Sequence, residues 1–175
     1  MASGQITQIA FATRDLAATM RYYSEHLGVG PWFVIPPARF TSATYRDRPC
    51  PAQVHVAFAN ANGMEIELVH QLDDTPSIWL GFLEGRPERE RFHHTCLRTD
   101  TYESDHARLV SQGYAVAMAG ETTRGRFAYL EHAASPETFL ELLESTPSRQ
   151  AMYAHVLLHA QRWEGRDAVR PMPQI

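Results

Sequence analysis

Cysteine is scarce in this 175-residue chain, and long apolar segments are missing altogether. The two cysteines, Cys50 and Cys96, lie in very different surroundings, which argues against the disulfide framework of a small secreted protein. No run approaches the roughly 18 apolar residues that a membrane-spanning helix needs, and the N-terminus lacks a basic flank followed by an apolar stretch. We therefore expect a soluble, cytoplasmic protein with two free thiols.

An excess of positive charge is also lacking. The chain has 16 Lys and Arg against 20 Asp and Glu, a net charge of −4. Because nucleic-acid surfaces draw on clustered Lys and Arg, we expect neither a nucleic-acid partner nor a membrane, but a small-molecule substrate. The hydrophobic fraction of 44% suffices for a core, and the length fits one globular unit or two small modules sharing one.

One pattern of strand, helix and terminal glycine occurs twice. Residues 6–13 alternate with the period of two that is typical of a strand; Asp15 then precedes a helical pattern that ends at Gly28. After a second strand pattern, Asp100 and Gly113 repeat this order, each 85 positions after its counterpart. The agreement in length as well as in type predicts two related modules.

Three further strand patterns follow each predicted helix. They cover residues 32–35, 54–59 and 64–71 in the first half, and 114–119, 127–131 and 138–144 in the second. This order predicts an α+β fold of two tandem βαβββ modules that form an open, curled mixed sheet, followed by a C-terminal helix. The predicted parts are a first module (1–72), a linker with a short helix (73–91), a second module (92–145), and a C-terminal helix and tail (146–175).

Two segments depart from the repeat. The first module holds about a dozen extra residues, for which the proline-rich stretch 36–51 is the obvious place. The tail has a helical pattern, and we expect it to cover a sheet edge or a partner.

Four polar residues are predicted to share the strand face that points away from the helices: Gln8, Glu67, His94 and Glu141. Apolar neighbours on both sides of each glutamate would pack against a helix, and His94 occupies the position in the second module that Gln8 occupies in the first. His93 is expected on the opposite face, as a packing residue or as a support for the ligand His94. A lone strand glutamate is usually solvated, but two carboxylates, an imidazole and an amide oxygen together suit one divalent ion: Zn, Ni, Mn or Co.

Over residues 5–145 the chain resembles the vicinal oxygen chelate superfamily, the glyoxalase and bleomycin-resistance group. The phrases that carry the resemblance are Thr7-Gln8-Ile9-Ala10, Leu27-Gly28-Val29-Gly30, Ile66-Glu67-Leu68, His93-His94-Thr95 and Phe139-Leu140-Glu141-Leu142. The resemblance is closest to members like glyoxalase I and methylmalonyl-CoA epimerase. It implies a metal inside an open barrel, bound by one residue from each of four strands.

Gln8 departs from the many members of this superfamily that have histidine at the first ligand position. The resulting set of Gln, Glu, His and Glu resembles that of zinc-type glyoxalase I, whereas an extradiol dioxygenase would be expected to use two histidines and one carboxylate. The resemblance therefore implies a redox-neutral lyase or isomerase of glyoxalase type. Such an enzyme stabilises the enolate of a substrate that chelates the metal through two neighbouring oxygens, with Glu141, or alternatively Glu67, as general base.

Two other functions stay open at this point: an enzyme like methylmalonyl-CoA epimerase, and a non-enzymatic protein that sequesters a drug. For the substrate pocket, the sequence offers Trp32, Phe33 and Tyr129 as apolar walls, with ordinary core as the alternative. Arg124 and Arg126 could clamp a carboxylate or phosphate, although a solvated turn is the commoner role; Arg126 is the substrate-binding candidate. We also expect a homodimer.

Overall fold

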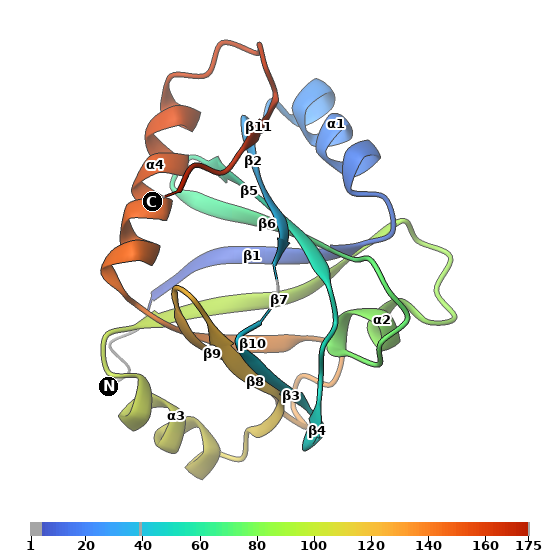
Figure 1. Ribbon diagram of the computed structural model, residues 1–175, viewed down its shortest axis with the longest axis vertical. Helices are drawn as coiled ribbons and strands as arrows, with labels where there is room; N and C mark the ends of the chain where they lie inside the picture. The colour runs from blue at the N-terminus through green and yellow to red at the C-terminus, as the bar shows by residue number, and fades with distance from the viewer. Residues whose placement is uncertain (1–4, 39, 175) are drawn as a thin grey trace.

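The computed structural model describes residues 5–38 and 40–174 (Figure 1). Its elements in chain order are β1 (Gln5–Thr13), α1 (Leu16–Leu27), β2 (Trp32–Ala38), β3 (Ser42–Tyr45), β4 (Arg48–Pro49), β5 (Val54–Ala61), β6 (Met64–Gln71), α2 (Ile78–Leu83), β7 (Glu90–Thr99), α3 (Tyr102–Ser111), β8 (Ala115–Thr122), β9 (Gly125–Glu131), β10 (Phe139–Glu144), α4 (Pro147–Gln161) and β11 (Val169–Pro171). Among the described residues, no helix is both long and apolar enough to span a membrane.

All the strands belong to one curled, unclosed mixed sheet, whose order is β11-β2-β5-β6-β1-β7-β10-β9-β8-β3-β4. Within each half, the first strand lies parallel to the last, β1 to β6 and β7 to β10. The two first strands, β1 and β7, pair antiparallel at the centre and join the halves. The predicted α+β fold of two βαβββ units with a C-terminal helix is confirmed.

The outer face of the sheet is covered by the helix of each repeat. Leu16, Met20 and Tyr23 of α1 pack on Ile66 and Leu68 of β6. The ends of α1 form as the sequence predicts. Asp15 accepts a hydrogen bond from the Ala18 N–H, and Gly28 ends the helix in the left-handed conformation, φ 66°.

In the second repeat, α3 covers the sheet in the same way, with Leu109 packed on Leu97, Leu130 and Leu142. Its start differs by one residue from the prediction, since Thr101 rather than Asp100 is the N-cap.

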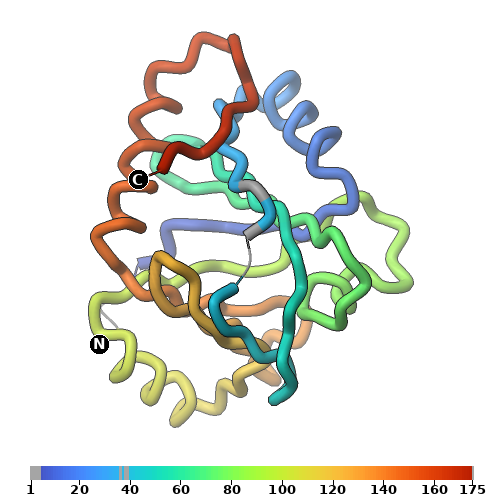
Figure 2. The backbone as a smooth tube through the Cα atoms, in the orientation of Figure 1, coloured from blue at the N-terminus to red at the C-terminus, as the bar shows by residue number. Residues whose placement is uncertain are grey.

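The proline-rich insertion forms β3 and β4, which leave the first half: β3 pairs with β8, and β4 pairs with β3 at the far end of the sheet. Gly120 allows this pairing, because a Cβ there would lie 2.3 Å from the Ser42 carbonyl oxygen of β3. The tail returns the other way: in Figure 2 the red C-terminal segment reaches the opposite edge, where β11 pairs parallel with β2.

Helix α4 covers a face of the sheet rather than an edge, which corrects the expectation for the tail. Met152 and Val156 pack on Phe33 and Phe58 from the inner side of the first half. In Figure 1, α1 and α4 flank the first-half strands on opposite sides. Helix α2 also lies on the inner side, where Ile78 and Trp79 join the largest apolar cluster. The curled sheet is thus capped by two helices outside the repeat.

Candidate metal centre

Four central strands bring together the four residues that the sequence singles out. Gln8 lies on β1, Glu67 on β6, His94 on β7 and Glu141 on β10, and each is at most 6% exposed. The Gln8 Nε2 donates a hydrogen bond of 2.6 Å to Glu67 Oε2. The Nε2 of His94 lies 3.3 Å from Glu67 Oε2 and 3.4 Å from Glu141 Oε2. One ligand atom from each of Glu67, His94 and Glu141 lies within 4.8 Å of the others, so this buried group could hold a metal ion.

Unsatisfied atoms at the centre fit such an ion. Both His94 Nε2 and Gln8 Oε1 are buried without a hydrogen-bond partner. Buried polar atoms are seldom left unpaired, because the loss of water costs about 1–3 kcal/mol for each. An imidazole nitrogen, an amide oxygen and two carboxylates also make a set of donors that suits Zn and neighbouring divalent ions.

The centre contains a histidine pair that the sequence analysis missed. A bulge in β7 opposes Ala10 with His94 and Phe11 with Phe92, which leaves His93 between the paired positions. His93 therefore does not point to the opposite face, as strict alternation predicted; it is 1% exposed and its Nδ1 lies 2.9 Å from the Nδ1 of His94. The position of His93 follows from the bulge, and a sequence pattern with a period of two does not predict a bulge.

This pair also orients the proton on His94. The carbonyl oxygen of Ile78 can only accept, so the Nε2 of His93, at 3.4 Å, donates to it. In neutral His93 the Nδ1 must then accept, and the Nδ1 of His94 donates. The His94 Nε2 is thereby left facing the two glutamates, as a metal ligand requires.

The charges of Glu67, His94 and Glu141 shift one another's pKa values, because the three side chains lie close together. Burial alone would lower the pKa of His94, but the adjacent carboxylates of Glu141 and Glu67 outweigh it and raise that pKa to about 9. Burial raises the pKa of Glu67. Burial also acts to raise the pKa of Glu141, but the neighbouring His94 prevails and holds that pKa below its usual range. In the metal-free protein the imidazolium therefore takes the place of a cation between the two carboxylates.

A third buried glutamate on the same face is already neutralised. Glu65 is 2% exposed and lies two positions before Glu67, but it forms an ion pair with Arg98, whose Nη2 donates a hydrogen bond of 2.8 Å to the Glu65 Oε1. The Arg98 guanidinium in turn stacks on the ring of Tyr153 from α4. Glu65 therefore has a fixed partner and is not one of the grouped ligand candidates.

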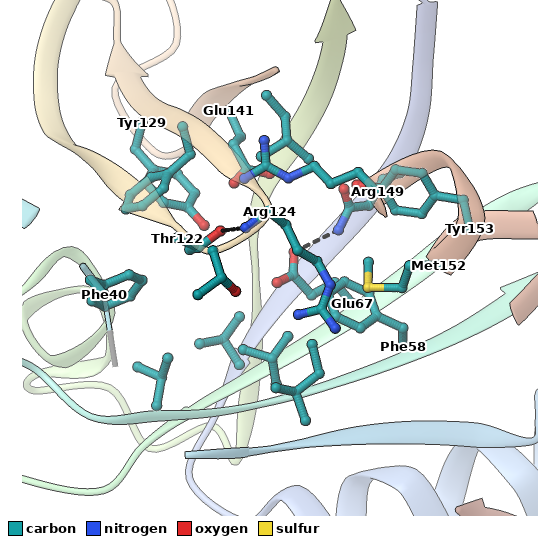
Figure 3. Close-up of a pocket in the computed structure, with 18 of the residues that line it drawn as sticks. Phe40, Phe58, Glu67, Thr122, Arg124, Tyr129, Glu141, Arg149, Met152 and Tyr153 are labelled. Atoms are coloured by element: carbon teal, nitrogen blue, oxygen red, sulfur yellow. Dashed lines mark hydrogen bonds between the residues drawn. The ribbon is translucent and has the colours of Figure 1, made fainter. Parts of the chain in front are cut away.

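The centre opens into a cavity of about 320 Å³ between the inner face of the sheet and α2, α4 and the β8–β9 hairpin. Gln8, Glu67 and Glu141 line it, with His94 fully buried beside them. Its large apolar walls include Phe40, Phe58, Met152 and Tyr153, labelled in Figure 3, and also Trp79 and Phe127. Trp79, Phe40, Met152 and Tyr153 come from outside the repeated strands, so the repeat did not predict their place in the cavity wall.

Of the five pocket residues that the sequence suggested, Tyr129 and Arg124 line the cavity, and the ring centroid of Tyr129 lies 5.0 Å from that of His94. Trp32 lies on the outer face against Tyr23. Phe33 shares the inner face but lies under α4, against His155.

Arg126 is likewise absent from the cavity wall, since its guanidinium pairs with Glu144 and Glu103. Its neighbour Arg124 and the helix residue Arg149 line the cavity instead.

Comparisons with known proteins agree with the fold. A crystal structure of a hypothetical protein from Bacillus halodurans C-125 matches with a TM-score of 0.60 and 18% identity, over 82% of this chain and 96% of that one. Methylmalonyl-CoA epimerase from Mycobacterium tuberculosis matches with a TM-score of 0.58 and 20% identity, over 86% and 96%. The Streptomyces coelicolor methylmalonyl-CoA epimerase in complex with 2-nitronate-propionyl-CoA matches with a TM-score of 0.51 and 19% identity, over 81% of this chain and 97% of that one. Identities this low support the fold alone.

A comparison with curated protein sequences finds no match. A sequence model described as Glyoxalase/Bleomycin resistance protein/Dioxygenase superfamily matches residues 7–129, well over half of the chain. The chain therefore belongs to the glyoxalase, bleomycin resistance protein and dioxygenase superfamily.

Proposed function

We propose that the protein is a metal-dependent lyase or isomerase that removes a proton beside a carbonyl group of a small, largely apolar substrate. The observation that carries this proposal is the buried group of Glu67, His94 and Glu141, in which one ligand atom from each lies within 4.8 Å of the others. A site of this composition, at the wall of an apolar cavity, suits binding and proton transfer more than it suits structural support.

The proposed ligands are Gln8, Glu67, His94 and Glu141, through the Gln8 Oε1, the His94 Nε2 and the carboxylate oxygens. A single divalent ion in this set, Zn, Ni, Mn or Co, supplies Lewis acidity that favours loss of a proton beside a carbonyl. With one histidine, the set lacks the two imidazoles of a typical iron dioxygenase site, which favours redox-neutral chemistry.

Glu141 is the better general base, and Glu67 the alternative. The Gln8 amide holds Glu67 by a hydrogen bond of 2.6 Å, whereas within the described part of the chain no amide restrains Glu141. A carboxylate that lines the cavity can accept a proton from one carbon and return it to another. The surrounding apolar walls, with Trp79 and Phe127 among them, limit competing water.

The test is hydrogen exchange in D₂O with a substrate panel: hemithioacetals, acyl-CoA epimers and 2-oxo compounds, each with several metals. Proton removal by the enzyme places deuterium at the carbon beside the carbonyl, which mass spectrometry detects even where net turnover is slow. We expect one ion per site, and loss of exchange in Glu141→Gln with the ion retained or bound more weakly. Glu144→Gln is the matched control, because Glu144 lies on the same strand but pairs with Arg126 outside the cavity.

Unaltered exchange in both Glu141→Gln and Glu67→Gln would refute the proposed base. The apolar walls also support a second candidate, a binding protein that sequesters an apolar compound without catalysis. That candidate would replace the first if protein purified without chelator contained no stoichiometric ion and Glu67→Ala left ligand binding intact.

A further inference from the structure

Two arginines line the cavity, and their situations differ. Arg149 of α4 is 5% exposed, and its guanidinium donates to three backbone carbonyls, those of Arg126 at 2.8 Å, Glu144 at 2.7 Å and Gly125 at 2.9 Å. These bonds fasten the β8–β9 hairpin and the end of β10 to α4. The guanidinium of Arg149 thus donates most of its hydrogen bonds to the backbone and has few donors left for a ligand.

Arg124, at the tip of the same hairpin, has no such partners. Among the residues that the structure describes, its guanidinium makes no hydrogen bond or ion pair, and its Nε is buried without a partner. Its side chain projects into the pocket (Figure 3). Arginine cannot release its proton to relieve this situation. The residue is half-buried, but its Nε–H is a buried donor of a charged group without an acceptor, and an anionic ligand would supply one.

The backbone of Arg124 is held from both sides. Its N–H donates to the Thr122 Oγ1 at 3.1 Å, the bond drawn in Figure 3, and its carbonyl accepts from the Thr146 Oγ1 at 2.7 Å. Thr146 is also the N-cap of α4, so the hairpin tip is tied to the helix that roofs the cavity. Such preorganisation limits the entropy lost when a ligand binds.

The acidic groups of the cavity are directed elsewhere. Glu67 and Glu141 line it, but both lie at the metal centre, against His94. The rest of the lining is chiefly apolar and aromatic. The cavity therefore combines a chelating centre, an apolar passage and one unpaired cation.

We propose that Arg124 recognises an anionic group, a carboxylate or phosphate, at one end of the ligand. The ligand class is a small compound with an aromatic or aliphatic body and one anionic end. The orientation of this ligand, with its other end toward Glu67, Glu141 and His94, rests on the function proposed above. Anion binding by Arg124 does not, since it requires no metal.

The experiment is calorimetry on chelator-treated, metal-free protein with matched probes: phenylalkanoates carrying one to three methylene groups, the corresponding phenylalkyl phosphates, and the corresponding neutral alcohols. The acids or the phosphates should bind on the order of tenfold more tightly than the alcohols, as charge-assisted hydrogen bonds allow. Whichever anion shows the larger preference identifies the source of the anionic group.

Three variants isolate the residue. Arg124→Met should abolish the preference for the anion while leaving alcohol binding unchanged, and Arg124→Lys should keep part of it. Arg126→Met is the matched control, because it removes the same charge from the same hairpin outside the cavity, and it should keep the preference. Arg124→Met should also melt no lower than the wild type, since no bond of the guanidinium to the fold is lost.

Equal binding of anions and alcohols, no binding of any anionic probe, or an unchanged preference in Arg124→Met would each overturn the proposal. The outcome is separable from that of the proposed function. An Arg124-dependent preference in a protein that binds no metal supports the anion site and contradicts the metal-dependent enzyme, while metal-dependent exchange without that preference does the reverse.

Discussion

Binding of a divalent ion at the candidate centre should release a proton from His94. In the metal-free protein the carboxylates of Glu141 and Glu67 overcome the effect of burial and raise the pKa of His94 to about 9, so its imidazole is cationic at neutral pH. A metal ligand must offer a free lone pair, and the Nε2 proton has to leave before the ion can bind. The metal and the proton therefore compete for one nitrogen.

The size of this competition follows from the pKa. At pH 7, about two pH units below the pKa of His94, the apparent affinity for the ion should be reduced about 100-fold. It should recover about tenfold for each pH unit and level off above about pH 9. A histidine with an ordinary pKa of about 6.5 would show almost no dependence above pH 7.

The same pKa affects the stability of the metal-free protein. The folded-state pKa of about 9 lies above the ordinary histidine value of 6.5. The stabilisation from His94 is therefore fully present below about pH 6.5 and is lost as the pH rises through about 9. Since the neighbouring glutamates partly compensate, we expect a loss of about 1–3 kcal/mol, or about 2–4 °C in melting temperature for each kcal/mol.

Calorimetric titration of metal-free protein with Co²⁺ at pH 7, in two buffers of different ionisation enthalpy, measures the protons released. We expect about one per ion bound. Glu141→Gln is the control, because loss of one neighbouring carboxylate lowers the pKa of His94 and should reduce both the proton count and the slope of affinity against pH. Binding that releases no proton, with an affinity that is constant from pH 7 to 9, would refute this account of the centre.

Four further predictions concern the supports of the site. His93→Phe should weaken metal binding by about 10–100-fold in a competition assay, because His93 fixes the proton of the imidazole ligand; unchanged affinity would contradict that role. Arg149→Met should cost about 3 kcal/mol in urea unfolding, since three carbonyls lose a charged donor; a loss below about 1 kcal/mol would mean that these bonds add little. The Arg126 guanidinium lowers the pKa of Glu144 to about 2. The resulting stabilisation is present above about pH 4.5 and fades toward pH 2. Glu144→Gln should therefore lower the free energy of unfolding by about 1–2 kcal/mol at pH 7 and by progressively less in acid. A loss that does not vary with pH would count against the ion pair. Gly120→Ala should lower the free energy of unfolding by about 2–3 kcal/mol, because a Cβ there meets the backbone of β3. Gly81→Ala is the control: a Cβ there has nothing within 4 Å, so this change should be neutral or slightly stabilising. Equal melting temperatures of the two variants would exclude the clash.

The grouping of the four polar residues at the candidate centre was predictable because strand alternation and the repeat act together. Glu67 lies between Ile66 and Leu68, both of which the outer helix requires, so its side chain has to face inward. The same argument applies to Glu141, and the repeat relates Gln8 to His94. Local patterns of this kind predict the folded structure correctly, since tertiary packing buries the strand faces that the patterns already define.

Alternation also explains why Trp32 lies outside the cavity. Trp32 and Phe33 are consecutive strand residues and cannot both face the same side, and the structure places Trp32 against α1. Arg124 and Arg126 differ in another way, since β9 begins between them and Arg126 pairs with Glu144 while Arg124 stays unpaired at the hairpin tip. A sequence lists the charges, but only the packed structure reveals which are already neutralised.

The least predictable parts of the molecule complete the cavity. The β3–β4 insertion pairs with β8 from the other half of the sheet, and α4 packs across the inner face through Met152 and Tyr153. Neither placement follows from a local pattern, because both depend on contacts between segments far apart in the chain. With these segments in place, the four candidate ligands and the wall around them all come from one chain. The predicted homodimer stays a prediction, and the candidate centre does not require it: a monomeric form in solution should bind the ion as well as any dimer does, because no ligand has to be supplied by a second copy.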